Sequence, residues 1–293
     1  MPQLRRAPPP SPSPVHAWRA PHEVRAQPDD AGPADLRAAI EQARAAGHPV
    51  TRLVPAWSEL FQRLPRLGEL LARTRSGGAV HETIGTYPEP EIAADHIAIR
   101  KRPLDLRVSP STWAHGLVVA DGERPRLQFY DAHGDLVHAI HARPRTHLDE
   151  LRALVDTLRA PDPSLDLDLS PRPARDPDRP DWAIDRNSLQ IGWFALDDLH
   201  AFADLLRAHG VSPTQALRLA PDGHARRVPA SAALQVLRAA AGCVLPITIA
   251  VERPGCLHRY SGPIGRVLVQ EPWVGVVDRN VSFRLRQDRI AQA

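Results

Sequence analysis

The 293-residue sequence has two cysteines, a single lysine and no long apolar run. Two cysteines, Cys243 and Cys256, are too few for a disulfide scaffold, and we expect both to be buried thiols in a reducing compartment. No window approaches the roughly 18 uninterrupted apolar residues of a membrane-spanning helix. The amino-terminal residues also lack the apolar stretch of a secretion signal. These absences indicate a cytoplasmic protein.

Several motifs for catalysis and binding are missing as well. A glycine-rich phosphate loop and a Gly-x-Ser-x-Gly motif are both absent, so nucleophilic hydrolysis has no support. His133, His138 and His141 are clustered, but without the spacing or cysteine partners typical of zinc sites. Arginine supplies nearly all the basic charge, Lys101 being the only lysine, and the net charge is +3. Because these arginines are scattered among aspartates, we expect no nucleic-acid binding, while an anionic small ligand would suit them.

What the sequence does contain is an internal repeat. Val80–Gly85 reads V-H-x-x-x-G, and Leu257–Gly262 reads L-H-x-x-x-G, 177 residues later (258 − 81). The same offset carries Leu106-Arg107-Val108 onto Phe283-Arg284-Leu285. Two ungapped matches indicate two copies of one unit of roughly 120 to 150 residues. The two histidines occupy equivalent positions, so a structural role is expected for them.

Each copy is predicted to begin with helices and to continue with strands. In the first half the patterns predict helices over 35–46, 56–64, 67–73 and 146–159, and strands over 80–84, 96–100, 104–108, 116–121, 127–130 and 136–141. In the second half they predict helices over 195–209, 212–219 and 230–240, and strands over 244–251, 256–260, 265–270, 274–278 and 281–285. The fold class is therefore α+β, an internal duplication with largely antiparallel sheets.

The predicted boundaries follow composition. Residues 1–33 are rich in proline and arginine and are expected to be disordered. Residues 34–160 form the first repeat, and 161–181, rich in proline and aspartate, form a linker. Residues 182–293 form the second repeat.

His200 is the most informative candidate for chemistry. It lies one position off the apolar stripe of its predicted helix, which includes Leu199, Phe202 and Leu206. Periodicity alone therefore favours a solvated histidine at the border of the polar face. A position near a helix amino terminus favours the neutral imidazole, which is the form that ligates a metal or haem iron.

Three arginines lie in the duplicated strand pattern. By alternation, Arg284 and Arg286 share one face of their strand, while Phe283 and Leu285 share the other. The simple interpretation is a solvent-facing side. The alternative is a cationic face, to which Arg107 would contribute, for a ligand that carries two carboxylates, because guanidinium groups bind carboxylates bidentately.

Short motifs occur in the same order as in a known bacterial family. In the first half they are Val50-Thr51-Arg52-Leu53, Trp57, Leu64–Glu69, Thr74-Arg75, Ala79–Gly85, Asp105-Leu106-Arg107, Trp113, His115-Gly116, Leu127–Asp131, Gly134 and Val137-His138. In the second half they are Asp198–Phe202, Leu205–Arg207, His209-Gly210, Ala216–Leu219, Pro254–Cys256, Ser261–Pro263, Pro272-Trp273, Leu285-Arg286 and Asp288. Together these motifs, over about residues 35–293, resemble the HemS/HmuS family of hemin-trafficking and hemin-degrading proteins.

The resemblance implies a ligand and its site. Family members bind one haem in a cleft between the halves, with an axial histidine at the position of His200. Arginines near the haem in the family match Arg107 and Arg286, which would hold propionates or cover the open iron face. Arg284 and Phe283 of the same strand complete the predicted haem-binding set, and the ligand or substrate is haem b (hemin).

The sequence also departs from the family pattern. Ser109 replaces a usual aromatic, and Arg284 replaces a usual histidine. The sequence stops at Ala293, where the family continues through another hairpin and a helix, so the second sheet is expected to expose an unpaired edge.

The leading functional hypothesis is haem binding and trafficking in iron acquisition, with a haem importer or a haem oxygenase as the transfer partner. The alternatives are a haem-degrading enzyme that opens the porphyrin ring and releases iron, and a decayed, truncated homologue that no longer binds haem. The enzyme hypothesis rests on analogy to the family alone, since no dinucleotide-binding fingerprint is present.

Overall fold

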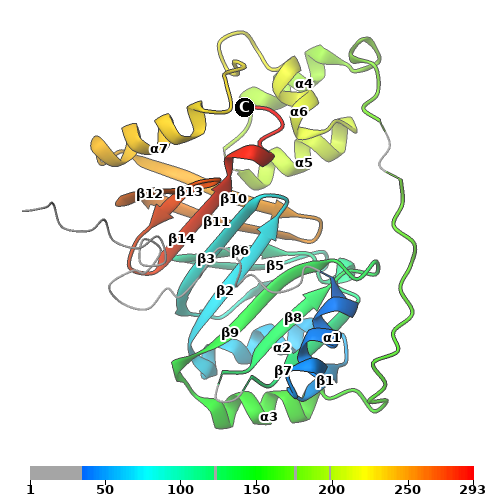
Figure 1. Cartoon of the computed structure of the whole chain (residues 1–293). Helices are drawn as coiled ribbons and strands as arrows, with labels where there is room; N and C mark the ends of the chain where they lie inside the picture. Colours follow the sequence, from blue (N-terminus) through cyan, green and yellow to red (C-terminus); the bar gives the residue numbers. More distant parts are fainter. Residues whose placement is uncertain (1–34, 122–123, 175–176, 198) are drawn as a thin grey trace, which may run out of the picture. The chain divides into compact units, whose positions relative to one another are not determined.

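Two antiparallel sheets contain all the strands β1 to β14 of the computed structural model (Figure 1), which describes residues 35–121, 124–174, 177–197 and 199–293. The side chains of Leu199 and His200 are not among the described groups, and the segment predicted to be disordered lies outside the described residues. Contacts divide the chain into two units. The first comprises residues 35–171 and 234–289, and the second comprises 172–233 and 290–293.

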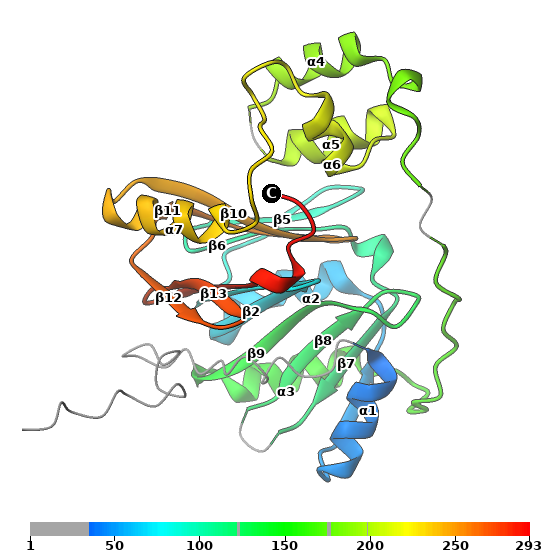
Figure 2. The same cartoon turned by 45° about the horizontal axis from the view of Figure 1, so that its top comes forward.

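The first unit contains both sheets. The larger has nine strands, in the order β1 (Val50–Leu53), β7 (His115–Val119), β8 (Arg126–Tyr130), β9 (Leu136–Thr146), β2 (Gly68–Ser76), β3 (Ala79–Thr86), β14 (Val281–Arg286), β13 (Trp273–Val277) and β12 (Arg266–Gln270). The smaller has five, in the order β10 (Pro246–Arg253), β11 (Cys256–Pro263), β6 (Leu104–Val108), β5 (Ile97–Lys101) and β4 (Glu91–Ile92). Figure 2 shows the same strands from a second direction.

The predicted repeat is visible in these strands, and the two copies exchange them. An offset of 177 residues converts the bounds of β3 into those of β11, and it carries β6 onto β14. Yet β14 pairs with β3, and β11 pairs with β6. Each sheet therefore combines early strands of one copy with late strands of the other. For this reason the first unit draws strands from both predicted repeats.

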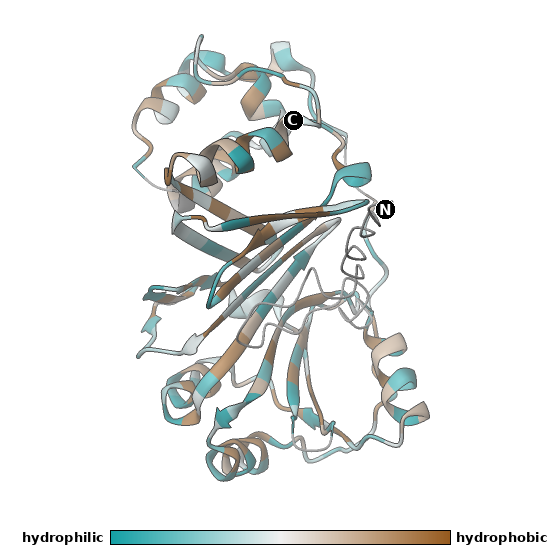
Figure 3. Cartoon of the chain, turned by 60° about the vertical axis from the view of Figure 1, so that its left-hand side comes forward, coloured by the Kyte–Doolittle hydropathy of each residue, from teal (hydrophilic) through white to brown (hydrophobic). Residues whose placement is uncertain are grey.

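Helices cover both faces of the first-half end of the large sheet. α1 (Leu36–Ala45) packs against Leu117 and Tyr130 on one face, and its amino terminus is capped by the Asp35 carboxylate, as predicted. α2 (Trp57–Arg63) and α3 (Leu148–Leu158) contribute to the apolar core on the other face. α7 (Ala232–Gly242) packs Leu237 and Ala240 into a second core with β10, β13 and β14. The alternation of apolar and polar residues along the strands can be followed in Figure 3.

Two local predictions for the first unit are wrong. Residues 67–73, predicted to be a helix, instead follow a 3-10 turn (Leu64–Leu67) and form the first part of β2. Thr146 does not cap α3, because its hydroxyl donates to the Glu69 carbonyl oxygen at 2.6 Å and accepts from the Arg143 amide.

The second unit is a small helical cluster. It contains a 3-10 turn (Asp181–Ala183), α4 (Arg186–Phe194), α5 (Leu199–His209) and α6 (Pro213–Leu219). The apolar core of the cluster includes Ile184, Leu189, Leu206, Val211, Ala216 and Leu219. The helix predicted over 195–209 begins only at Leu199, and α4, which precedes it, lies where the sequence predicted no helix.

The cysteines differ in environment. Both are free thiols, as expected, and Cys256 is buried, but Cys243 is exposed, so the prediction that both are buried is wrong for Cys243. Burial raises the pKa of the Cys256 thiol to about 12, which makes this group unreactive at neutral pH.

Candidate functional site

His200 is the second residue of α5 in the second unit. The helix begins at Leu199, so the backbone places His200 in the first helical turn. Unpaired amide groups and the helix dipole give this end of a helix partial positive charge, which disfavours an imidazolium ion. The backbone position therefore suits a histidine that acts as a neutral ligand.

Arg107 lies in the middle of β6 in the small sheet, opposite Leu257 of β11. Its side chain is 21% exposed, and its Nη2 atom lies 4.0 Å from the Asp95 carboxylate. On the same strand face, Arg259 donates through Nε to Asp105 at 2.9 Å. This face of β6 and β11, opposite the one that carries Leu106, therefore presents two partly accessible guanidinium groups.

Arg284 has a different environment. It is 1% exposed and lies 3.4 Å from Glu82 through Nη2, while Arg73 donates to the other oxygen of Glu82 at 2.6 Å. Burial acts to raise the pKa of Glu82, but the two arginines outweigh it and lower the net pKa, so the carboxylate stays ionised. Arg284 thus does not lie on a solvent-facing or open cationic strand side. It is part of a buried ion cluster of Arg73, Glu82 and Arg284.

Arg286 ends β14 and is more accessible, with 35% of its side chain exposed. Its guanidinium donates to both oxygens of Asp288, at 2.9 and 2.7 Å, and lies over the ring of Trp273 at 5.8 Å. These hydrogen bonds from Arg286 are the main cause that lowers the pKa of Asp288. The pair holds Arg286 in one orientation at the end of the strand.

Phe283 lies on the opposite face of β14 from the two arginines, as alternation predicted. It is 9% exposed and packs with Ile249, Val276 and Leu237 in the second core. The structure therefore separates Phe283 from the surface that Arg286 occupies.

The repeated histidines form a contact that sequence equivalence alone did not predict. The rings of His81 and His258 are stacked with centroids 4.0 Å apart, and both side chains are fully buried. His81 Nδ1 donates to the His258 carbonyl oxygen at 3.3 Å, and His258 Nε2 shares a hydrogen bond with the Thr83 hydroxyl at 2.9 Å. This arrangement fits the structural role that their equivalent positions indicated.

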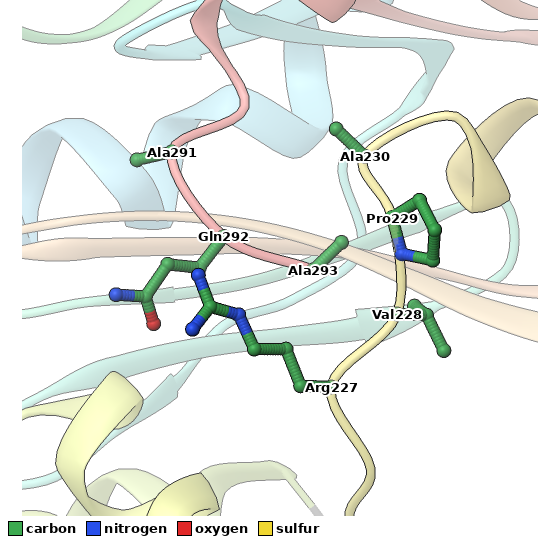
Figure 4. A pocket seen from close by; sticks show the side chains of 7 residues that line it. All are labelled: Arg227, Val228, Pro229, Ala230, Ala291, Gln292 and Ala293. Atoms are coloured by element: carbon green, nitrogen blue, oxygen red, sulfur yellow. The ribbon is translucent and has the colours of Figure 1, made fainter.

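Both units contain pockets that are candidate ligand sites. One, of about 380 Å³, lies in the second unit between Arg227–Ala230 and Ala291–Ala293 (Figure 4). Two in the first unit, of about 490 and 670 Å³, lie beside α3 and beside Trp57 respectively. None of the three is lined by a predicted haem-binding residue. Within the described ranges, no group of three or more His, Cys, Asp or Glu side chains could hold a metal ion, and no helix has the length and apolarity needed to cross a membrane.

Sequence reasoning missed the acidic partners of the arginines. Asp288 follows Arg286 by two residues, a spacing that could have indicated the pair. Asp95 and Glu82 lie on other strands or loops, and no local pattern connects them with Arg107 or Arg284.

Comparison with known proteins gives a consistent result. The chain is 29% identical to the hemin transport protein HmuS of Yersinia pestis, over 84% of this chain and 72% of that protein. It is similar in structure to holo-PhuS, a heme-binding protein from Pseudomonas aeruginosa, with 30% identity, a TM-score of 0.78, and coverage of 96% of this chain and 84% of that one. The heme degrading enzyme ChuS of Escherichia coli O157:H7 matches at 26% identity and a TM-score of 0.73, over 86% and 74% of the two chains.

A family model matches the chain in two segments, residues 37–158 and 210–293. The gap between the segments contains α5, so the match does not include His200. Two matched segments agree with the duplication seen in the strands. Because they cover more than half of the sequence, the chain belongs to the family of the Haemin-degrading HemS.ChuX domain.

Proposed function

We propose that this protein binds hemin and passes it on after haem uptake, as part of iron acquisition. The observation that carries the proposal is the similarity to holo-PhuS, a heme-binding protein, over 96% of the chain at 30% identity. The names of the Yersinia relatives, hemin transport proteins HmuS and HemS, support the same function. The cytoplasm is the proposed location, which suits a chain with two free thiols.

His200 is the proposed axial ligand of the haem iron. The support is its position in the first turn of α5, because the helix dipole disfavours an imidazolium ion there and the neutral imidazole is the form that ligates iron. Haem iron in proteins is commonly held by such a histidine, while apolar walls take the macrocycle.

Arg107 and Arg286 are the proposed partners of the propionates. Both are partly exposed, and each lies beside a carboxylate, Asp95 or Asp288, which orients the guanidinium before the ligand arrives. Arg284 and Phe283, predicted as part of the same set, are better explained as structural residues. Arg284 belongs to the buried ion cluster, and Phe283 belongs to the second core.

The test of the axial ligand is a hemin titration followed by the Soret and visible bands. His200→Ala should shift these bands and weaken binding by at least tenfold, since the iron loses its protein ligand. His209→Ala, at the other end of the same helix, is the matched control and should leave both unchanged. The double variant shows whether His209 becomes the iron ligand when His200 is absent. Wild-type spectra for His200→Ala and for the double variant would refute the assignment.

A second experiment separates carriage from degradation, because the similar ChuS is described as a heme degrading enzyme. The hemin complex is incubated with a reductant, with and without oxygen, and then with an apo-globin as acceptor. We expect the porphyrin to remain intact and to move to the acceptor. Loss of the Soret band with release of iron would instead identify a ring-opening enzyme, and the absence of any Soret band on titration would indicate a homologue that no longer binds haem.

A further inference from the structure

A pocket of about 490 Å³ lies between α3 and the end of the large sheet that β1 and β7 form. Its volume is within the roughly 300–1,000 Å³ that is typical of small-molecule sites. The residues that line this α3 pocket are Thr51, Val118, Ala120, Pro125, Leu148, Leu151, Arg152, Val155, Asp156 and Arg159. All of them belong to the first unit, and none is among the residues predicted to bind haem.

The floor of the α3 pocket is apolar because the pocket opens from the main core. Val118 and Leu151 are 5% and 2% exposed and belong to that core. Leu148 and Val155 lie at the border of the apolar stripe of α3 and are only partly buried. A hydrocarbon group that enters the pocket would leave water and lie against these side chains, which is favourable in proportion to the apolar area covered.

The charged groups of the pocket lie on α3. Arg152 and Arg159 are seven residues apart, so they project from the same side of the helix about two turns from each other. Arg152 Nη1 donates to the Asp149 carboxylate at 2.8 Å, and Arg159 Nη2 donates to the Asp156 carboxylate at 2.7 Å. All four side chains are more than half exposed, and ion pairs of this kind contribute little free energy. The carboxylate of a ligand can therefore replace either aspartate.

The charges of the lining favour an anionic ligand. Arg152 and Arg159 both line the α3 pocket, and Asp156 is the only carboxylate among the described lining residues. In the pocket beside Trp57, by contrast, Glu59 is the only charged residue of the described lining. Guanidinium groups bind carboxylates through two parallel hydrogen bonds. An apolar floor with guanidinium groups at its rim suits a molecule with a hydrocarbon part and a carboxylate.

Backbone hydrogen bonds fix one end of the α3 pocket. Val54 N donates to Leu158 O at 2.8 Å, and Ala160 N donates to Arg52 O at 2.9 Å. These bonds join the carboxyl end of α3 to β1 and the residue after it, on either side of Arg159 in the sequence. The backbone of Arg159 is therefore in place before a ligand binds, which reduces the entropic cost of binding.

We propose that the α3 pocket binds a small amphipathic carboxylate. Its hydrocarbon part lies against Val118, Leu151 and Val155, and its carboxylate accepts hydrogen bonds from Arg152 and Arg159. An amphiphile of the same length with a cationic head is rejected, because its charge would face the two guanidinium groups. The proposal does not depend on haem binding.

Isothermal titration of the full chain with decanoate, in the absence of hemin, tests the proposal. We expect one decanoate to bind per chain and decylamine not to bind. Arg152→Gln and Arg159→Gln should each weaken decanoate binding by at least about tenfold, because each removes a charged donor. Arg44→Gln, at an exposed position near the end of α1, is the control and should bind decanoate like the wild type.

A second pair of variants tests where the hydrocarbon lies. Val155→Trp fills the pocket and should abolish decanoate binding. Ala153→Trp, at an exposed position of the same helix, should leave binding unchanged. Circular dichroism checks that both variants are folded, and the two arginine variants decide the question if Val155→Trp is not.

Several results would overturn the proposal. These are a wild type that does not bind decanoate, decylamine that binds as tightly as decanoate, or decanoate binding that persists in folded Val155→Trp. Displacement of decanoate by one equivalent of hemin would also overturn it, because decanoate would then lie in the haem site. If hemin does not bind but decanoate binding depends on Val155 and Arg159, the proposed function fails and the α3 pocket remains.

Discussion

At the scale of single residues, the stacked pair His81 and His258 and the nearby His138 are the most informative buried groups. All three are fully buried, and the ring of His138 lies 6.1 Å from that of His258. Burial is the main cause that lowers the pKa of His81 to about 4 and of His138 to about 3, and it also lowers the pKa of His258 well below its ordinary value. The folded protein therefore holds three neutral imidazoles at neutral pH.

These histidines predict a loss of stability in acid. Below the ordinary pKa of 6.5 the unfolded chain binds protons that the folded chain does not, so the free energy of unfolding should fall as pH decreases from about 6.5 towards 4. Each such histidine contributes up to about 1.4 kcal/mol per pH unit in that window, and none above it. Urea unfolding followed by circular dichroism at several pH values measures the slope.

His81→Phe keeps a ring in the stack without a titrating group. It should reduce the slope of the unfolding free energy against pH by up to about 1.4 kcal/mol per pH unit, which is the contribution of one bound proton. His224→Phe, at an exposed position, should leave the slope unchanged. A wild-type stability that is flat between pH 7 and 4 would contradict the prediction.

The buried ion cluster gives a second prediction. Glu82→Gln leaves the guanidinium groups of Arg73 and Arg284 in the sheet without this carboxylate, and it should destabilise the fold by about 3–5 kcal/mol at pH 7. Glu59→Gln breaks an exposed pair with Arg63 and should change stability by less than about 1 kcal/mol. Urea unfolding of both variants makes the comparison, and equal losses would show that burial does not decide the effect.

The environments of some of these residues could be predicted from the sequence, and those of others could not. The equivalence of His81 and His258 followed from the repeat, because both histidines have the same local pattern. The burial of Arg284 did not, because its carboxylate partner comes from β3 in the other half of the chain, and strand alternation gives a side chain's face but not what covers it. The position of His200 near the start of a helix was predicted to within a few residues.

At the scale of elements, most strands were predicted within two or three residues, while β2 was mistaken in part for a helix. Leu67, Leu70 and Leu71 recur at the spacing of a helical face, and they indicate a helix if one face is assumed to be solvated. β2 lies in the interior of the sheet and is buried on both faces, so its apolar residues need not alternate. Local periodicity cannot distinguish these two cases.

The pairing of β13 with β14 predicts a strict requirement at Gly275. A Cβ atom there would overlap the carbonyl oxygen of Phe283 in the neighbouring strand, and backbone cannot move aside as a side chain can. Gly275→Ala should therefore lower the free energy of unfolding by about 1–3 kcal/mol. Gly85→Ala is the control, since its Cβ would meet only Pro103 at 3.8 Å, and it should change stability by less than about 1 kcal/mol. Equal melting temperatures for the two variants would contradict this account.

At the scale of the whole molecule, the repeat was predictable but the exchange of strands was not. The 177-residue offset is a property of the sequence, and the equivalent strands appear where it places them. Either repeat could have paired its own strands, since β3 and β11 are equivalent, as are β6 and β14. The choice between the two arrangements depends on contacts between distant segments. The division into repeats at 34–160 and 182–293 remains a proposal.

The exchange predicts that neither half folds alone. A fragment of residues 1–171 lacks β14, the neighbour of β3, and a fragment of 172–293 lacks β6, the neighbour of β11. Expressed separately, each should show no cooperative thermal transition by circular dichroism, because an interior strand is missing from its sheet. Expressed together, the fragments should co-purify and melt as one complex. Cooperative melting of either fragment alone would contradict the prediction.

The position of β14 also affects the protein during its synthesis. Residues 281–286 insert between β3 and β13, so one side of β3 has no neighbour until these residues leave the ribosome. β3 ends at Thr86 and β14 begins at Val281, so the large sheet of the nascent chain stays incomplete while all the residues between them are translated. We expect chaperones that bind extended apolar segments to associate with this open strand until β14 has been made.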